Sequence, residues 1–176
     1  MRMDKLTTKF QEALGEAQTL ALSNDHAYIT PAHLLVAMLR QDDGPKALLQ
    51  RAGVNVPQLL SAAEAYVKKQ PQVQGQEQVS VDRDMGSLLQ ASEKESIKRK
   101  DQFVSNDMFL LALSDSKAEI GNIARASGMT RKSLESAIDT VRGGQSVDHA
   151  DAEEQRESLK QYCIDLTERA RLGKLD

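Results

Sequence analysis

Apolar residues recur at intervals of three and four along nearly the whole chain, which is the period of amphipathic α-helices. The first such stretch runs from Leu6 to Ala21. A second begins at Thr30-Pro31, where the threonine can cap a helix and the proline suits its first turn. Residues 33–39 are apolar on almost every side, so we expect this second helix to be largely buried.

The second half of the chain repeats this pattern at an offset of 75 residues. Tyr28-Ile29-Thr30 aligns with Phe103-Val104-Ser105, which keeps an aromatic residue, a β-branched residue and a capping hydroxyl in order. Gly53, a predicted helix stop, aligns with Gly128. Caps, buried helices and stops that agree in one register indicate an internal duplication. The sequence therefore predicts an all-α fold made of two pseudo-symmetric four-helix repeats.

The predicted organisation is one domain of two repeats, followed by a tail. The repeats occupy residues 1–69 and 81–142. Residues 70–80 are rich in glutamine and show no helical period, so they are predicted to link the two repeats. Two glycines follow the last predicted helix, and we therefore place the domain at 1–145. Residues 146–176 are predicted to form a second linker and a short helical tail.

The formal net charge of -3 on this 176-residue chain comes entirely from the tail. Residues 146–176 carry five basic and eight acidic side chains, which leaves 18 of each in 1–145. A neutral domain lacks the basic surface of a general nucleic-acid binder. The most concentrated basic stretch, Lys94 to Lys100, lies at a predicted helix end, where cations complement the helix dipole. A nucleic-acid-binding module that uses this stretch is the least favoured alternative.

Candidate catalytic and metal-binding residues are few. The chain has one cysteine, Cys163, and three histidines, His26, His33 and His149, which are not spaced as zinc ligands are. Neither of the common glycine-rich phosphate loops, GxxxxGK and GxGxxG, occurs. We expect no enzyme activity, no metal and no cofactor in this chain. Since no export signal or membrane span is evident, we also expect a cytoplasmic protein without membrane contact.

The predicted duplication suggests where a binding site would lie. Two similar helical bundles that pack side by side form a groove at their seam, and such grooves are frequent binding sites. The two repeats differ at one helix start, where Ala32-His33 aligns with Asp107-Met108. The helix dipole favours the aspartate at this position, and methionine is a flexible apolar residue that suits varied contacts.

Two parts of the sequence, together with the duplication, carry a resemblance to a known family. Residues 1–10 (MRMDKLTTKF) and the helix that follows Thr30-Pro31 resemble the N-terminal domain of Clp-type AAA+ unfoldases. In the tail, residues 152–155, 159–170 and 173–176 resemble the ClpB family more closely than the ClpA or ClpC families. The resemblance covers essentially the whole chain.

The resemblance implies a substrate-recognition domain of a hexameric, ATP-driven cytoplasmic disaggregase that works with the DnaK system. In that family the segment matching residues 173–176 leads into the first AAA+ module. ATP and Mg²⁺ would therefore be bound beyond this chain, which by itself would be a monomer without ATPase activity. The alternative is the N-terminal domain of a protease-linked ClpA- or ClpC-type unfoldase that docks adaptor proteins.

The resemblance also implies five residues that bind unfolded or aggregated polypeptide clients. Thr7 matches a Leu-Thr-x-Lys-Phe segment and Asp101 matches a Lys-Arg-x-Asp-x-Phe segment. Asp107 stands where the family often has Glu, and Leu89 and Met108 match a neighbouring apolar surface. Purely local roles are the alternative for Thr7, as a helix hydroxyl, and for Asp101, as a loop acid. We expect weak binding of apolar, extended segments in the seam groove, with the acidic residues disfavouring acidic clients.

Overall fold

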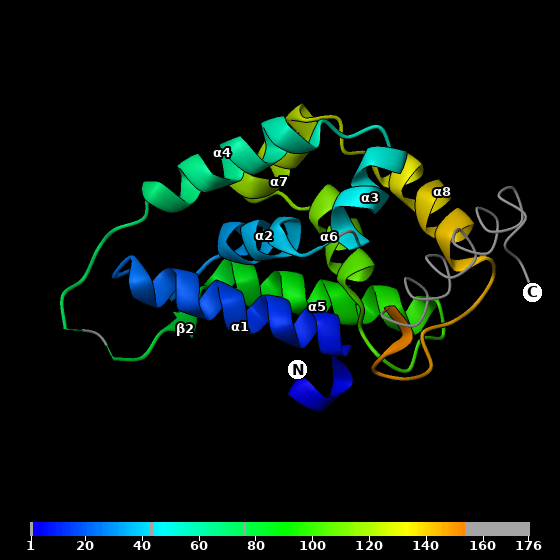
Figure 1. Ribbon diagram of the computed structural model, residues 1–176, viewed down its shortest axis with the longest axis horizontal. Coiled ribbons are helices and arrows are strands. Elements are labelled where there is room, and N and C mark those ends of the chain that lie inside the picture. Colours follow the sequence, from blue (N-terminus) through cyan, green and yellow to red (C-terminus); the bar gives the residue numbers. More distant parts are fainter. Residues whose placement is uncertain (1, 43, 76, 154–176) are drawn as a thin grey trace, which may run out of the picture.

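The computed structural model describes residues 2–42, 44–75 and 77–153, and over these residues the predicted all-α class is confirmed (Figure 1). Most of the predicted helical tail lies outside the described residues. None of the helices in the described ranges is long and apolar enough to cross a bilayer. The elements, in chain order, are α1 (Thr8–Ser23), β1 (Tyr28–Ile29), α2 (Pro31–Arg40), α3 (Gly44–Arg51), α4 (Val56–Lys68), β2 (Ser80–Val81), α5 (Arg83–Lys98), α6 (Asn106–Ser114), α7 (Glu119–Ala126) and α8 (Arg131–Arg142).

The 75-residue offset predicted from the sequence is present in the helix boundaries. Helices α5, α6, α7 and α8 each begin 75 residues after α1, α2, α3 and α4. Even the backbone irregularities match, because Asp25 (φ 58°) and Lys100 (φ 62°) both adopt a positive φ that is unusual for residues other than glycine. Gly53 and Gly128 also share the left-handed conformation that ends a helix. The bounds proposed for the repeats, the linker and the domain stay a prediction.

Two short backbone pairings show how the repeats are related. In the parallel pair of β1 and β2, Ile29 lies opposite Val81. A second parallel bridge joins Leu6 to Val104. The 75-residue offset converts one pairing into the other, with the roles of the two repeats exchanged. The repeats are therefore arranged about a pseudo-twofold axis, as two identical subunits are in a symmetric dimer. The sequence predicted no strands, and the two-residue strands β1 and β2 are the exception.

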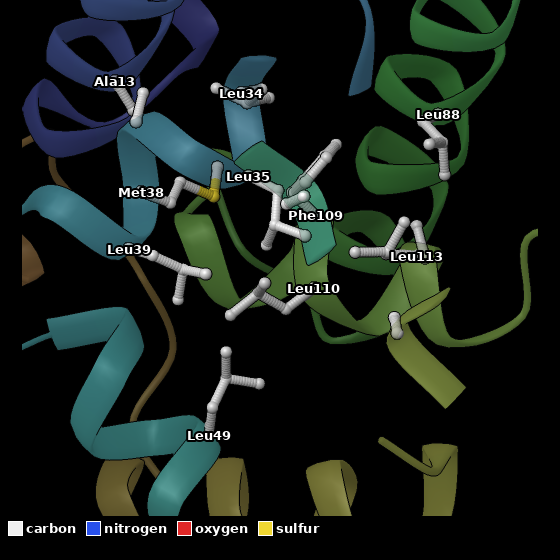
Figure 2. Close-up of a cluster of buried hydrophobic side chains, with 14 of the residues drawn as sticks. Ala13, Leu34, Leu35, Met38, Leu39, Leu49, Leu88, Phe109, Leu110 and Leu113 are labelled. Atoms are coloured by element: carbon white, nitrogen blue, oxygen red, sulfur yellow. The ribbon is translucent and has the colours of Figure 1, made fainter. Parts of the chain in front are cut away.

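Both repeats contribute to one hydrophobic core. Helices α1 and α2 pack together in the first repeat, as α5 and α6 do in the second. Across the seam α3 packs on α8 and α4 packs on α7, with α2 and α6 in the middle of the molecule (Figure 1). The ring of Phe10 on α1 meets that of Phe109 on α6 edge to face, with centroids 6.3 Å apart. Figure 2 shows Phe109 among leucines from both repeats. The duplicated unit is thus folded as one body.

The helix starts explain why the local sequence folds in this way. Thr30 accepts a hydrogen bond from the backbone N–H of His33, whose ring accepts one in return from the backbone N–H of Thr30. From Pro31 to Leu39 every residue of α2 is buried, as the apolar pattern predicted. Side-chain caps also begin α1, α4, α5 and α8, at Thr7, Asn55, Asp82 and Thr130.

Candidate functional site

Three backbone segments meet at one end of the seam. The first is residues 2–8, which run into the first residue of α1, and the second is residues 99–107, which follow α5 and include the start of α6. The third is residues 145–153, which follow α8; we call this segment the strap. The backbone carbonyl of Val147 in the strap accepts hydrogen bonds from the N–H groups of Gln102 (2.8 Å) and Phe103 (3.3 Å). The N–H of Thr8 donates to the carbonyl of Ala150 at 3.0 Å. The strap therefore joins the first repeat to the second at this junction.

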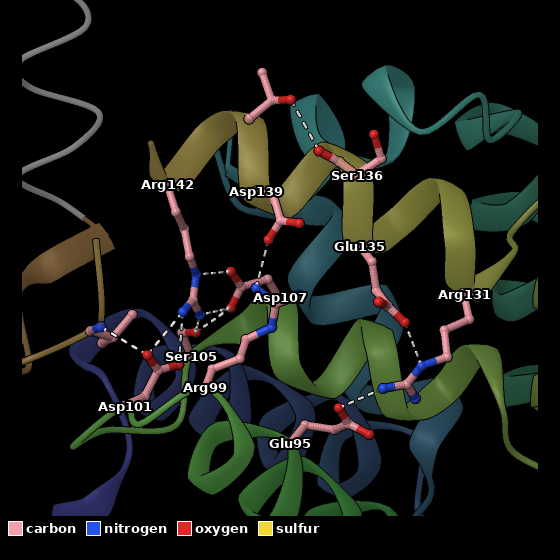
Figure 3. A network of polar contacts seen from close by, with 12 residues as sticks. Glu95, Arg99, Asp101, Ser105, Asp107, Arg131, Glu135, Ser136, Asp139 and Arg142 are labelled. Carbon is pink, nitrogen blue, oxygen red and sulfur yellow. Dashed lines mark hydrogen bonds and ion pairs between the residues drawn. The ribbon is translucent and has the colours of Figure 1, made fainter. Parts of the chain in front are cut away.

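A buried ion-pair cluster holds the junction together (Figure 3). Nη1 of Arg142, the last residue of α8, lies 2.9 Å from both carboxylate oxygens of Asp101. The same guanidinium donates through Nε to Asp107 at 3.1 Å and through Nη2 to Ser105 at 3.1 Å. The Ser105 hydroxyl donates in turn to Asp107, and the N–H of Val147 donates to Asp101 at 3.0 Å. Three side chains of the second repeat thus converge on one arginine, and the strap backbone is joined to this cluster through Asp101.

The charges in this cluster largely satisfy one another. The side chains of Arg142 and Asp101 are 4% and 0% exposed, and that of Asp107 is 11% exposed. Burial by itself would lower the pKa of Arg142, but the carboxylates of Asp107 and Asp101 outweigh it and raise this pKa, so the guanidinium stays charged. Since both acids face Arg142, their repulsion of acidic clients would be weaker than the sequence suggested.

Thr7 connects the N-terminal ends of two helices. It is fully buried, and its hydroxyl oxygen caps α1 by accepting a hydrogen bond from the N–H of Phe10 at 3.2 Å. The same hydroxyl donates to the carboxylate of Glu153 at 2.6 Å. The N–H of Asn106, in the first turn of α6, donates to that carboxylate at 3.3 Å. Glu153 thus lies where two helix dipoles favour a negative charge. The local capping role considered for Thr7 is present.

The two apolar residues of the predicted site are less accessible than the sequence suggested. Met108 lies in the first turn of α6 and has no exposed surface. Leu89 is half-buried on α5, where it packs against the core. The structure therefore brings Thr7 and Asp101 together around the strap and places Asp107 beside Asp101 on Arg142, whereas Met108 lies beneath the surface. The assignment of these five residues to client binding stays a prediction.

The sequence analysis missed Arg142, although a signal for it exists. Leu134, Ile138 and Arg142 follow one another at intervals of four, which places them on the same face of α8. The first two are buried, so an arginine continuing that face needs buried carboxylate partners. Glu153 carried no comparable signal, because its partners belong to distant parts of the chain.

The first repeat has a different buried polar pair at the equivalent place. This pair consists of His26 and His33, and His33 aligns with Met108 of the second repeat. Nδ1 of His26 lies 2.8 Å from Nε2 of His33, and both side chains are buried. Desolvation, and after it the proximity of His26, lowers the pKa of His33 to about 4. Desolvation also lowers the pKa of His26, against the opposing effect of Asp25. The two rings are therefore neutral near pH 7, and a single hydrogen bond joins them.

Metal binding by this histidine pair finds no support in the described part of the chain. Among residues 2–42, 44–75 and 77–153, no three His, Cys, Asp or Glu side chains are grouped so that they could hold an ion. The pair instead links the turn after α1 to the start of α2, because His33 also contacts the capping residue Thr30.

Two residues of the basic stretch near the end of α5 are paired with acidic side chains. Lys98 lies 3.7 Å from Glu95, and Arg99 forms a 2.9 Å ion pair with Asp139. Glu95 also pairs with Arg131 at 2.8 Å (Figure 3). These acidic partners reduce the positive charge that the stretch would offer to a nucleic acid.

One pocket lies away from the junction, within the second repeat. It has a volume of about 440 Å³ and lies between α5 and the turn that joins α6 to α7. Apolar side chains of Leu88, Ala91 and Ala112 line it together with the carboxylates of Asp84 and Asp115. This pocket is not at the seam, where the sequence analysis placed the binding groove.

A duplicated helical domain with a strap docked across its seam defines the class of protein. The family model described as the Clp repeat (R) N-terminal domain matches residues 5–127. The chain therefore belongs to the Clp N-terminal domain family, which confirms the resemblance stated from the sequence.

The chain is also similar to individual proteins of known name. The whole chain is 42% identical over 178 residues to the chaperone protein ClpB of Vibrio cholerae. It is 39% identical to ClpB of Pseudomonas putida and 34% identical to ClpB of Bacillus cereus, again over its full length. In each case the chain spans 21% of the relative. It thus corresponds to about a fifth of a ClpB chaperone.

Solved structures support the fold. The N-terminal domain of Hsp104 from Candida albicans matches with a TM-score of 0.74 at 23% identity, over 85% of this chain and 99% of that one. The N-domain of ClpV from Vibrio cholerae matches with a TM-score of 0.65 at 20% identity, over 80% and 87%. At these identities the likeness establishes the shared fold alone.

Proposed function

We propose that this chain is the client-recognition domain of a ClpB-type ATP-dependent disaggregase. In this proposal it binds unfolded or aggregated polypeptide at the junction of Thr7, Asp101 and the strap, and delivers it to the pore of a hexamer. The observation that carries the proposal is that Thr7 and Asp101, which are distant in sequence, both contact the strap, and that Asp107 shares Arg142 with Asp101 beside it. A solved complex of the ClpV N-domain with a VipB peptide, whose fold matches with a TM-score of 0.64, supports peptide binding by such domains.

The junction is chemically suited to a polypeptide. Peptide N–H and C=O groups need partners when they leave water, and the strap already obtains such partners from Gln102, Thr8 and Asp101. Binding through a few backbone contacts and small apolar side chains is weak and tolerant of sequence. In a hexamer, six tethered copies would raise the effective concentration of sites and compensate for weak individual affinity.

The remaining steps belong to the whole protein. We propose that ATP and Mg²⁺ are bound by AAA+ modules outside this chain, that the chain itself catalyses no reaction, and that the hexamer acts in the cytoplasm with the DnaK system. The domain alone would be a monomer whose task is recognition.

An NMR titration tests the proposed site. The ¹⁵N-labelled chain is titrated with reduced, carboxymethylated lactalbumin, which is permanently unfolded. We expect amide shifts to concentrate at Thr7, Leu89, Asp101, Asp107 and Met108. Leu89→Ala should weaken binding, whereas Leu60→Ala, at another half-buried leucine packed on the core, is the matched control. Shifts that spread evenly over the domain, or equal effects of the two substitutions, would contradict the site.

A further inference from the structure

The strap crosses the proposed client site and uses its polar groups. Its backbone at Val147 donates to Asp101 and accepts from Gln102, and its carbonyl at Ala150 accepts from Thr8. The side chain of Asp151 accepts from the Thr8 hydroxyl at 2.9 Å. These contacts extend from the end of α8 to the start of α1, so the strap is docked along its length.

Buried apolar side chains also fix the strap. Val147 is 1% exposed and Ala152 is 8% exposed, whereas Asp148 between the docked positions is exposed. Residues 145–148 of the strap form no helix or turn, whereas residues 149–151 form a turn and the last two residues are helical. A segment that buries small apolar side chains and pairs its backbone with the domain has chemistry expected of a bound polypeptide. The strap therefore occupies the junction as a client would.

The polar groups of the junction cannot serve two occupants at once. The Thr7 hydroxyl has one proton, which it donates to Glu153. The N–H of Gln102 is likewise engaged by the carbonyl of Val147. A client that binds through these groups must displace their present partners.

The equivalent corner of the molecule is built differently. There the residue that aligns with Thr7 is Asp82, whose own carboxylate caps α5 by accepting from the N–H of Met85 at 2.8 Å. The acid is thus part of the helix start. At the junction the carboxylate comes instead from Glu153, on a segment that follows the last helix of the repeat. That acid belongs to neither α1 nor α6, so it can leave without unfolding either of the two helices whose starts it contacts.

We propose, resting on the client-binding function proposed above, that the strap is a cis-acting competitor of the client. Client binding at Thr7 and Asp101 releases the strap, and release changes the freedom of the segment that follows α8. The domain thereby couples client binding to the conformational freedom of the strap. Since only the strap-released fraction binds, the apparent dissociation constant equals the intrinsic one divided by that fraction.

Two alanine variants of the full chain test this coupling. Glu153→Ala removes the carboxylate that Thr7 and Asn106 share, and Asp148→Ala removes an equal charge from an exposed position of the same strap. Hydrogen exchange of the Val147 and Thr8 amides reports strap docking. The dissociation constant of fluorescein-labelled, reduced and carboxymethylated lactalbumin reports client binding. Both are measured at one salt concentration.

We expect Glu153→Ala to speed exchange at both amides and to tighten lactalbumin binding about three- to tenfold, because a hydrogen bond to a charged group is lost from the closed state. Asp148→Ala should change neither readout. In the parent protein, saturating lactalbumin should also speed exchange at Val147.

The outcomes separate the two proposals. If lactalbumin binds the parent and Glu153→Ala equally well, and Val147 stays protected in the complex, competition is refuted while client recognition stands. If neither protein binds lactalbumin, client recognition fails, and the strap is then a structural element without a competitor.

Discussion

The guanidinium of Arg142 and the carboxylate of Asp101 form an ion pair in which one nitrogen lies 2.9 Å from both oxygens and neither side chain reaches solvent appreciably. Because Asp101 also accepts the N–H of Val147, this pair is the point at which α8, the loop before α6 and the strap are joined. The candidate site therefore depends on a buried charge that the sequence did not reveal.

Arg142→Met is expected to destabilise the domain by about 3–5 kcal/mol, because it leaves the buried carboxylates of Asp101 and Asp107 without a counter-charge. Urea unfolding followed by circular dichroism measures the change. The matched control is Arg99→Met, since the partner of Arg99, Asp139, is 69% exposed. An exposed pair of this kind contributes less than about 1 kcal/mol. Equal losses in the two variants would mean that the buried cluster adds no more stability than the exposed pair.

Thr7→Val is expected to lower stability by about 1 kcal/mol through loss of the α1 cap, and also to loosen the strap. Thr130 caps α8 in the same manner, by accepting from the N–H of Ser133 at 3.2 Å, and its hydroxyl also contacts that of Ser133 at 2.7 Å. Thr130→Val should therefore cost similar stability without affecting the exchange of the Thr8 amide. Unchanged Thr8 exchange in Thr7→Val would show that Glu153 docks independently of this hydroxyl.

The helical repeat could be predicted because its signals are local. A capping residue such as Thr30 and a stop such as Gly53 act within one turn of the chain, and the stop recurs 75 residues later. The cap expected at Ser105 was wrong, because the Ser105 hydroxyl contacts Asp107 and Arg142 and makes no cap to α6. The burial of α2 could likewise be predicted from its own apolar residues, without knowledge of the rest of the fold. The fold class therefore followed from periodicity and caps.

The site could be predicted only in part, because its contacts join distant residues. Thr7 and Asp101 were named through the family resemblance, but Arg142 and Glu153, which hold them, were not. Glu153 lies 146 residues from Thr7, and no pattern in one sequence indicates such a contact. The pairing of Ile29 with Val81 was also invisible, since two-residue strands carry no alternation.

The histidine pair predicts that stability decreases in mild acid. His33 has a pKa of about 4 in the folded protein and 6.5 as its ordinary value. Between these values the unfolded chain binds a proton and the folded one does not, so the free energy of unfolding falls as the pH drops from 6.5 towards 4. The difference between the two pKa values corresponds to a loss of about 3 kcal/mol. The lowered pKa of His26 acts in the same direction.

Urea unfolding at pH 7 and at pH 4 measures this dependence. His33→Gln should flatten it, because glutamine can keep hydrogen bonds at this place without titrating. His149→Gln, at an exposed histidine, is the control and should leave it intact. If the free energy of unfolding falls equally between pH 7 and pH 4 in the parent and in His33→Gln, the acid sensitivity belongs to other groups.

Two glycines within helices are expected to respond to alanine in opposite ways. At Gly121, on α7, a Cβ would lie 2.3 Å from the backbone carbonyl oxygen of Ser116, and this backbone is held by the bond from the N–H of Ser116 to the carbonyl of Leu113. Gly121→Ala should therefore destabilise by about 1–3 kcal/mol. At Gly15, on α1, nothing lies within 4 Å, so Gly15→Ala should stabilise by about 0.5–1 kcal/mol through helix propensity.

Thermal unfolding distinguishes these effects, since about 1 kcal/mol shifts the midpoint by roughly 2–4 °C in a chain of this size. The midpoint should fall for Gly121→Ala and rise for Gly15→Ala. If both midpoints rise, the turn between α6 and α7 can shift to accommodate a methyl group. Ser116, which lines the pocket beside α5, would then be able to move. If the midpoint of Gly121→Ala falls as expected, the backbone at Ser116 is rigid, because a carbonyl that could move would make room for the methyl group.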